Sequence, residues 1–269
     1  MRAAMMGDNC FDVYERLGRA YPTGNVVDTG VNLRKLGVEV SILSATGSDF
    51  RGQMMRETLG KLDLDLSHLK VLEGKTAVTY MDMEDNDRIH GEYDEGVLGK
   101  MQFDLEDQRF ALDHDLIHSA LWGKADQALC EIRKQSSIPI SFDFADRLDH
   151  PLVEAMEGIV DYGFFSYKGQ RDSWIEAFLK QRVEKGMRQA IATFGKSGSL
   201  VYDGEHYHEF GIFPAKVVNT VGAGDSYIAG YLYGLLQNWP IHECQKLGAK
   251  VAAQVVAVFE PWGEGELYR

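Results

Sequence analysis

Short apolar runs alternate with amphipathic stretches along most of the chain. The apolar runs have the length of buried strands, and we expect strands at residues 2–7, 39–45, 115–121, 138–144, 160–166 and 189–194. The stretches between them carry apolar residues at helical spacing, which predicts helices at 24–36, 51–62, 124–135 and 170–185. Alternating strands and helices are typical of a mainly parallel sheet with helices on both faces. We therefore expect an α/β fold, a three-layer α/β/α sandwich around a Rossmann-like sheet.

Residues 76–93, "TAVTYMDMEDNDRIHGEY", interrupt this alternation. Two short β-type runs flank the polar stretch "EDND" with no helix between them, which predicts a hairpin. We expect this hairpin, over about 76–96, to project from the sheet as a small lid. A second β-type pair spans 199–210, with Asp203 and Gly204 at its turn. No linker-like segment or repeat divides the chain, so we expect one domain over residues 1–269.

Composition narrows the functional classes. The chain has 269 residues, 45% of them hydrophobic, which is enough for a full core. Its formal net charge of −13 argues against binding nucleic acid or an anionic membrane through a general basic field. No apolar run is long enough to span a bilayer, and the three cysteines form no C-x-x-C pair. We expect a cytoplasmic protein that acts on small molecules.

Candidate chemistry lies in "NTVGAGDSY", residues 219–227, just ahead of an apolar stretch at helical spacing. We expect a buried helix to begin near Gly222, followed by a last helix after Pro240 in which Leu247, Val251, Val255 and Val258 share one face. Bare backbone at a helix N-terminus exposes N–H groups at the positive end of the helix dipole, an arrangement that binds phosphate.

Asp225 would lie in the first turn of that helix, beside a transferring phosphate, where it could accept the proton of an attacking hydroxyl. This geometry is that of a kinase. The stretch alone leaves a second interpretation open, in which Asp225 complements the helix dipole, Thr220 caps the helix and the glycines allow tight packing. It matches neither the P-loop nor the dinucleotide-binding fingerprint, and this disfavours an NAD-dependent oxidoreductase.

The same stretch resembles the signature D-T-x-G-A-G-D of the ribokinase-like (PfkB) sugar kinases, and it departs only at Asn219. The resemblance implies an ATP-dependent kinase with Mg²⁺, in which Gly222, Ala223 and Gly224 form an anion hole and Asp225 is the catalytic base. Further family features follow in order along nearly the whole chain. "MMGDNCFDVY" resembles the first strand and "PTGNVVDTGVNLRKLG" a sugar-binding motif, which implies sugar contacts from Asp12, Gly24, Asn25 and Asp28. "TFGKSGS" resembles a turn beside the nucleotide, which implies nucleotide contacts from Thr193, Gly195, Gly198 and Thr220.

Other stretches, among them "GDNCFDVY", "GEYDEGV", "LWG" and "FDFADRLDHPL", resemble the members of the family that act on Amadori compounds, which are ketoses carried on an amine. This implies phosphorylation of the 6-hydroxyl of a substrate such as fructoselysine. Acidic residues crowd positions 82–96, where they could attract the ammonium of a lysine conjugate. Arg88 among them could bind the substrate carboxylate. A solvated hairpin with ordinary surface charge is the competing interpretation.

Some positions depart from the family pattern. The double glycine is Thr23-Gly24 here, and a later asparagine is Asp28, which loses an amide donor. The N-x-x-E motif that organises magnesium should lie near 166–169, where the chain reads "SYKG", so the metal ligands are unknown. Two alternatives therefore stay open: a family kinase for another sugar, sugar acid or nucleoside, and a catalytically silent ligand-binding protein. The expected partners are the sugar-amine and ATP, with a homodimer through the lid as one option.

Overall fold

The computed structural model describes residues 1–84 and 87–262, including their side chains except at 83, 84 and 87–90. Its centre is a nine-stranded sheet in the order β13-β12-β11-β10-β9-β8-β1-β4-β5. The strands are β1 (Arg2–Met6), β4 (Glu39–Gly47), β5 (Leu69–Leu72), β8 (Leu116–Ala120), β9 (Ile140–Asp143), β10 (Tyr162–Ser166), β11 (Gln189–Thr193), β12 (Ser199–Tyr202) and β13 (Tyr207–Phe210). Seven neighbouring strands of this sheet, β11, β10, β9, β8, β1, β4 and β5, pair in parallel, and β12 and β13 add an antiparallel edge.

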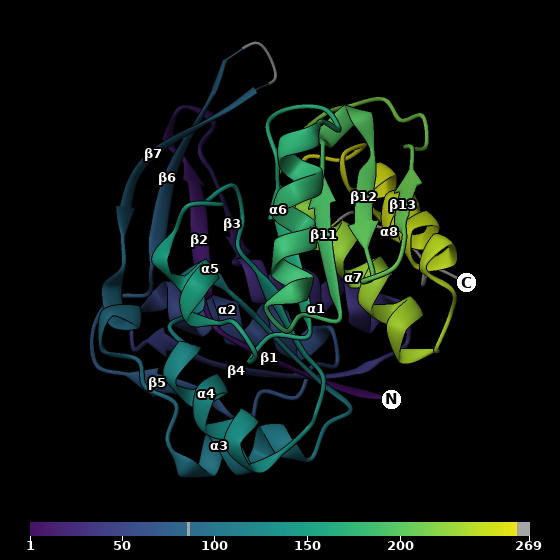
Figure 1. Cartoon of the computed structure of the whole chain (residues 1–269). Coiled ribbons are helices and arrows are strands. Elements are labelled where there is room, and N and C mark those ends of the chain that lie inside the picture. The colour runs from purple at the N-terminus through teal and green to yellow at the C-terminus, as the bar shows by residue number, and fades with distance from the viewer. Residues whose placement is uncertain (85–86, 263–269) are drawn as a thin grey trace.

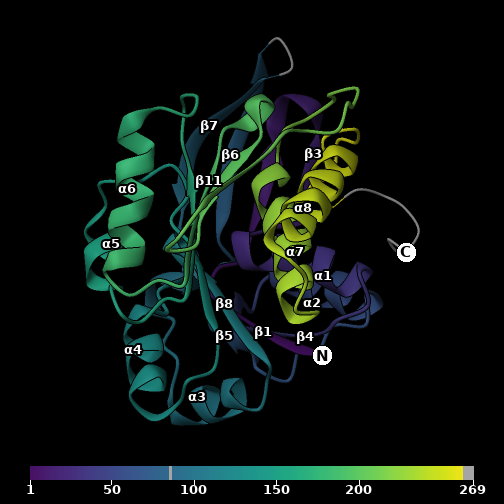
Figure 2. The ribbon, with the colours of Figure 1, turned by 45° about the vertical axis from the view of Figure 1, so that its right-hand side comes forward.

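Helices cover both faces of this sheet, as the turned view of Figure 2 shows. One face carries α1 (Asn25–Lys35), α2 (Phe50–Lys61), α7 (Ala223–Leu236) and α8 (Ile241–Val255), and the other carries α3 (Leu105–Leu112), α4 (Asp126–Gln135), α5 (Pro151–Ala155) and α6 (Ser173–Glu184). Short 3-10 turns lie at Glu15–Leu17, Gly96–Lys100, Leu121–Gly123 and Gly195–Ser197. The expected three-layer α/β/α sandwich is confirmed, and each predicted strand and helix is found with shifts of a few residues at its ends.

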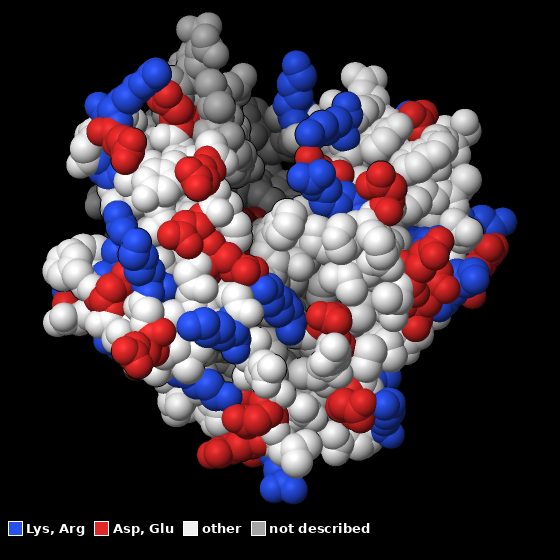
Figure 3. Space-filling model, turned by 90° about the vertical axis from the view of Figure 1, so that its left-hand side faces the viewer, with Lys and Arg blue, Asp and Glu red and all other residues white. Residues whose placement is uncertain are grey.

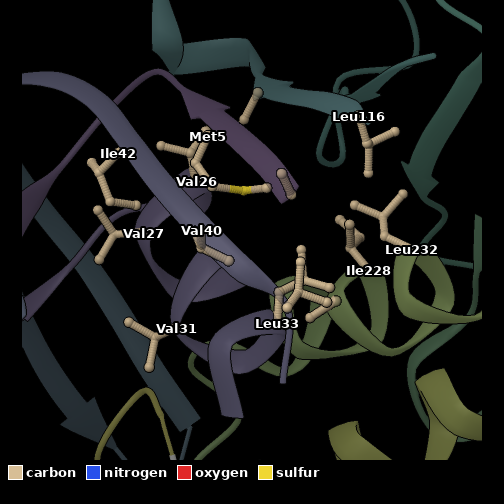
Figure 4. Packing of buried hydrophobic residues seen from close by; sticks show 14 of the residues in the cluster. Met5, Val26, Val27, Val31, Leu33, Val40, Ile42, Leu116, Ile228 and Leu232 are labelled. Atoms are coloured by element: carbon tan, nitrogen blue, oxygen red, sulfur yellow. The ribbon is translucent and has the colours of Figure 1, made fainter. Parts of the chain in front are cut away.

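Two apolar cores lie on either side of the sheet. On the α1 and α7 side, one apolar cluster includes Val27 and Val31 of α1, Ile228 of α7, Met5 of β1 and Ile42 of β4 (Figure 4). The strands are apolar on both faces because both are covered by helices, which is why their sequences run apolar without alternation. Within the described residues, no helix combines the length and the apolar character that crossing a bilayer requires.

A second sheet of four strands, in the order β3-β2-β6-β7, projects from the body (Figure 1). Its strands are β2 (Cys10–Tyr14), β3 (Arg19–Thr23), β6 (Val78–Glu84) and β7 (Asp87–Asp94). The hairpin expected over 76–93 is the antiparallel pair β6–β7, but the lid is larger than that hairpin. The segment that carries Asp12 was expected to form part of the first strand, and it is instead a separate strand of the lid, because it pairs in parallel with β6.

Local chemistry explains several element boundaries. Gly24, with φ of 134°, lies just ahead of α1, so this helix begins at Asn25. The Asp172 side chain accepts a hydrogen bond from the backbone N–H of Ile175, so α6 begins at Ser173. Helix α8 ends at Val255, so Val258, which was expected on the same helical face, lies beyond it.

Candidate active site

A cavity of about 1170 Å³ opens where β1, β8, β9, β10 and β11 end at their carboxyl edge. Strand order reverses beside β1, and clefts of parallel sheets form at such points. The lid contributes Cys10, Asp12, Thr79 and Tyr93 to the wall, and the first turn of α7 contributes Gly224 and Asp225. The cavity therefore lies between the lid and the body, at the place where an α/β sheet binds small ligands.

The N-terminus of α7 forms a bare, rigid turn in this wall. Gly222 has φ of 71°, and a Cβ at this residue would lie 2.5 Å from the carbonyl oxygen of Pro261. The Ser226 hydroxyl donates to the carbonyl of Gly222 at 2.7 Å and fixes the turn. A Cβ at Gly224, in contrast, would meet no atom within 4 Å, so the backbone there is open to the cavity. The first N–H groups of a helix lack partners in the helix, so this turn can bind an anion.

Helix α1 orients the half-buried Asp225. The Asn25 side-chain amide donates to Asp225 Oδ1 at 3.2 Å, and the Thr29 hydroxyl donates to the Asp225 backbone carbonyl at 3.3 Å. Both donors lie on the first two turns of α1, which packs directly against α7. The carboxylate is therefore fixed next to the α7 N-terminus, within reach of a group bound there.

Two more carboxylates surround Asn25. Its backbone N–H donates to Asp8 Oδ2 at 3.0 Å, and its side-chain amide lies 3.4 Å from Asp143 Oδ2. The second oxygen of Asp143 accepts from the backbone N–H of Ala145 at 2.9 Å. Burial raises the pKa of the Asp8 carboxyl and of the Asp143 carboxyl to about 6 each. The cavity wall next to α1 is thus rich in carboxyl groups.

Asp28 lies deeper in the same wall, and both of its oxygens accept hydrogen bonds. The Thr23 hydroxyl donates to one oxygen at 2.7 Å, and the Trp262 indole N–H donates to the other at 2.5 Å. Burial, and then the charge of Asp225, raise the pKa of the Asp28 carboxyl well above its usual range. The two residues that depart from the family pattern, Thr23 and Asp28, therefore contact each other. Asp28 lacks the amide donor of the asparagine that it replaces, and its two oxygens instead accept hydrogen bonds from Thr23 and Trp262.

Asn219 also has a structural explanation. Its amide donates to the carbonyl of Phe259 at 2.9 Å, and its side-chain oxygen accepts from the backbone N–H of Val221 at 3.1 Å. An aspartate, which the family signature has here, could not donate to that carbonyl. Asn219 thus ties the segment of residues 256–262 to the loop ahead of α7.

The structure gathers most of the predicted site residues around the cavity. Those that line it are Asp12, Gly24, Asn25, Asp28, Thr193, Gly195, Thr220, Gly222, Gly224 and Asp225. Ala223, the first residue of α7, does not line it. Gly198 does not line it either: it closes the turn between β11 and β12, where a Cβ would lie 2.1 Å from the carbonyl oxygen of Phe210. The backbone of Arg88 lies in β7, and its side chain lies outside the described part.

Sequence reasoning missed Asp8 and Asp143 as site residues, and Trp122 also lines the cavity. Each follows or ends a parallel strand: Asp8 follows β1, Asp143 ends β9 and Trp122 follows β8. Polar and aromatic residues at the carboxyl ends of parallel strands are the signal that could have found them.

The segment 166–169, where a magnesium motif was expected, lines the cavity with the residues "SYKG". Asp172, the nearest carboxylate along the chain, caps α6 and accepts from the Tyr167 hydroxyl at 2.8 Å. Among the described residues, no group of three or more His, Cys, Asp or Glu side chains is arranged to hold a metal ion. The side chains here do not form a metal site of their own.

The chain is similar in sequence and in fold to known kinases. A family profile described as pfkB family carbohydrate kinase matches residues 21–261. Fructoselysine 6-kinase of Escherichia coli (strain K12) is 32% identical over 259 residues, which cover 96% of this chain and 98% of that protein. Fructosamine kinase FrlD of Bacillus subtilis (strain 168) is 26% identical over 273 residues, covering 100% of this chain and 95% of that protein.

The fold is also found among solved structures. Arabidopsis thaliana ribokinase, solved with ribose and ATP, superposes with a TM-score of 0.83 at 16% identity, covering 99% of this chain and 93% of that one. The family match and the relative at 32% identity each extend over most of the chain. On these grounds, the chain belongs to the pfkB family of carbohydrate kinases.

Proposed function

We propose that the protein transfers the γ-phosphoryl group of ATP to the 6-hydroxyl of an Amadori compound such as fructoselysine. The observation that carries the proposal is the position of Asp225, fixed by Asn25 beside the open N-terminus of α7. A carboxylate next to an anion-binding turn can accept the hydroxyl proton while the turn stabilises the charge on the transferring phosphoryl.

The sugar would lie between the lid and α1. Asp12 on β2 and Asn25 on α1 line the cavity from two sides, and they are the proposed contacts to sugar hydroxyls together with the backbone at Gly24. Asp28 has both oxygens bound by Thr23 and Trp262, so its proposed role is to shape this wall. Closure of the lid over these groups would exclude water from the reaction.

The nucleotide would extend from α7 along the ends of β10 and β11. Thr193, Gly195 and Thr220 line that part of the cavity, and Lys196 is an exposed cation beside them. A triphosphate can bring its own Mg²⁺, held by phosphate oxygens and water, so the lack of a protein metal site among the described residues is compatible with a kinase. When bound, the ion would neutralise phosphate charge, and the protein groups named here would orient the two substrates.

The choice of an Amadori compound rests on the likeness to fructoselysine 6-kinase and fructosamine kinase. The first experiment is to measure ADP release with Mg-ATP and fructoselysine, other Amadori compounds, fructose, ribose and adenosine. We expect turnover with an Amadori compound. Turnover with another substrate alone would support a kinase activity but reject Amadori compounds as its substrates. Ligand binding without turnover would favour a catalytically silent protein.

Replacement of Asp225 tests the base. We expect Asp225→Asn to lower kcat about 10³-fold while nucleotide binding stays within a few-fold, because general-base catalysis typically contributes two to four orders of magnitude. Asp146→Asn is the matched control, since Asp146 also lines the cavity but pairs with Lys168. If Asp225→Asn retained kcat, the assignment of the base would be wrong.

A further inference from the structure

Asp8 and Asp143 are two of several buried carboxylates in the cavity wall. Neither Asp8 nor Asp143 forms an ion pair with any Lys, Arg or His among the described residues. Asp146, another acid in the wall, differs because Lys168 lies 2.7 Å from it. Burying an ionised carboxylate without a partner is costly, so a cation from outside the protein is the expected complement.

Asp8 is the residue that most needs such a partner. It is only 5% exposed, and its Oδ2 atom is occupied by the backbone N–H of Asn25. Its Oδ1 atom has no hydrogen-bond partner among the described residues, although Asp8 lines the cavity. Capping the start of α1 uses only one of the two oxygens, so this role does not explain the second.

The surroundings fit an organic ammonium better than a metal ion. Tyr93 of the lid and Trp122 after β8 line the same cavity and are both 45% exposed. Tyr93 lies near enough to Asp8 for the carboxylate charge to contribute, after burial and Cys10, to the raised pKa of its phenol. Gly123, next to Trp122, lies against Gly7, next to Asp8. Aromatic faces attract organic cations, whereas a hard metal ion requires several oxygen ligands.

Three described acids of the lid already have partners. Asp82 pairs with Arg16 at 2.9 Å, Glu95 pairs with Lys124, and Asp94 accepts from the backbone N–H of Gly96 at 3.0 Å. Long-range attraction by the lid remains, but a direct contact to a substrate amine is better supplied by Asp8.

Building on the proposed function, we propose that Asp8 binds the protonated amine of the substrate, with the carboxylate of Asp143 and the aromatic faces of Tyr93 and Trp122 completing the ammonium subsite. Asn25 connects this subsite to the reaction, because its backbone contacts Asp8 and its side chain contacts Asp225. The amine on C1 and the reacting hydroxyl on C6 would therefore be recognised from the two sides of one residue. Asp8 is a specificity residue: it selects aminated ketoses over neutral ones.

The first test uses the unmodified protein and two ligands that differ in one atom. Fructoselysine is compared with its ether isostere, in which oxygen replaces the nitrogen on C1, by calorimetry without nucleotide and by kcat/KM with Mg-ATP. We expect the amine to be preferred about hundredfold in both measurements, as expected for a buried charge contact. Equal binding of the two ligands would overturn the subsite, and this outcome needs no variant to fold.

The second test compares Asp8→Asn with a matched lid variant, Asp82→Asn, after checking that both retain a cooperative thermal transition. We expect the ratio of kcat/KM between amine and ether to fall at least tenfold in Asp8→Asn, through loss with the amine, and to stay within twofold in Asp82→Asn. An equal loss with both ligands in Asp8→Asn would mean a structural role, and a fall of the ratio confined to Asp82→Asn would assign the amine to the lid. Both results overturn the proposal.

The two proposals fail in different ways. If the unmodified protein prefers the amine in binding but phosphorylates no Amadori compound, the proposed function fails and the subsite stands. If it phosphorylates fructoselysine and the ether isostere with equal efficiency, the proposed function stands and the subsite fails. If it neither binds nor phosphorylates an aminated ketose, both fail.

Discussion

Asp8 is a residue whose ionisation opposes folding. Burial raises the pKa of the Asp8 carboxyl from its ordinary value of 3.8 to about 6, so between pH 3.8 and pH 6 the unfolded chain loses this proton before the folded chain does. The unfolded state then binds fewer protons than the folded state, and stability falls as pH rises through this window. The full cost, about 3 kcal/mol for a shift of this size, is present above pH 6 and absent below pH 4.

We therefore expect Asp8→Asn to raise the melting temperature of the ligand-free protein at pH 7.5, by several degrees, and the gain to disappear as pH falls toward 4. Asparagine keeps an oxygen for the N–H of Asn25 and removes the buried charge. Thermal melts of both proteins across pH 4–8 measure the difference, with Asp113→Asn, an exposed acid, as control. A gain that does not depend on pH would contradict the electrostatic origin.

At the scale of single residues, the sequence identified Asp225 and Asn25 because both lie in recognisable motifs. Asp8 and Asp143 were missed because their place in the cavity wall depends on the convergence of β1, β9 and α1 in space. The pairing of Thr23 with Asp28 was also hidden: two departures from a motif look like separate losses until their side chains are seen in contact.

Two glycines at the N-terminus of helix α7, Gly222 and Gly224, form a matched pair for substitution. In Gly222→Ala, the left-handed φ and the approach of the Pro261 carbonyl oppose the added methyl group, so we expect destabilisation and loss of activity. In Gly224→Ala, the methyl group meets open space in a helix, so we expect stability to rise by up to about 1 kcal/mol.

Activity should nevertheless fall in Gly224→Ala, because the methyl group projects where a phosphate would approach the backbone. Thermal melts and steady-state kinetics of the two variants separate these effects. A Gly224→Ala protein with unchanged KM for ATP and unchanged kcat would show that this turn does not contact the nucleotide.

Elements of the central sheet were predicted well, since a buried parallel strand carries its signal in its own apolar residues. The lid was only partly predicted. Strand β2 pairs with β6, so that Phe11 lies opposite Val78, and a local pattern does not reveal a partner so far along the chain. Helices α3 and α5 were missed because they are short, and the capping box of Asp104 and Asp107 that starts α3 was not used as a signal.

Residues 256–262 contact three separate parts of the molecule: the lid, α1 and the loop ahead of α7. Phe259 packs on Tyr14 and Tyr21 of the lid side, with ring centroids 5.4 and 5.6 Å apart. Trp262 donates to Asp28, and the carbonyl of Pro261 lies over Gly222. This segment therefore contacts the lid, α1 and the loop ahead of α7 at once.

Asn219→Asp tests this connection by restoring the residue of the family signature. The carboxylate would face the Phe259 carbonyl in place of an amide donor, so we expect a loss of about 1–2 kcal/mol in stability and faster hydrogen exchange at residues 256–262. Gln135→Glu is the matched control, because that amide also donates to a carbonyl but is exposed to water. Equal effects of the two changes would argue against the connection.

This segment also sets an order of events during synthesis. A ribosome makes the cavity wall at Asp8 early, the turn at Gly222 late, and Phe259, Pro261 and Trp262 later still. Although the first strands can pair while the chain is growing, the turn ahead of α7 and the wall at Asp28 lack their contacts until residue 262 has left the exit tunnel. A nascent chain would thus lack a complete cavity wall until Phe259, Pro261 and Trp262 can fold against it.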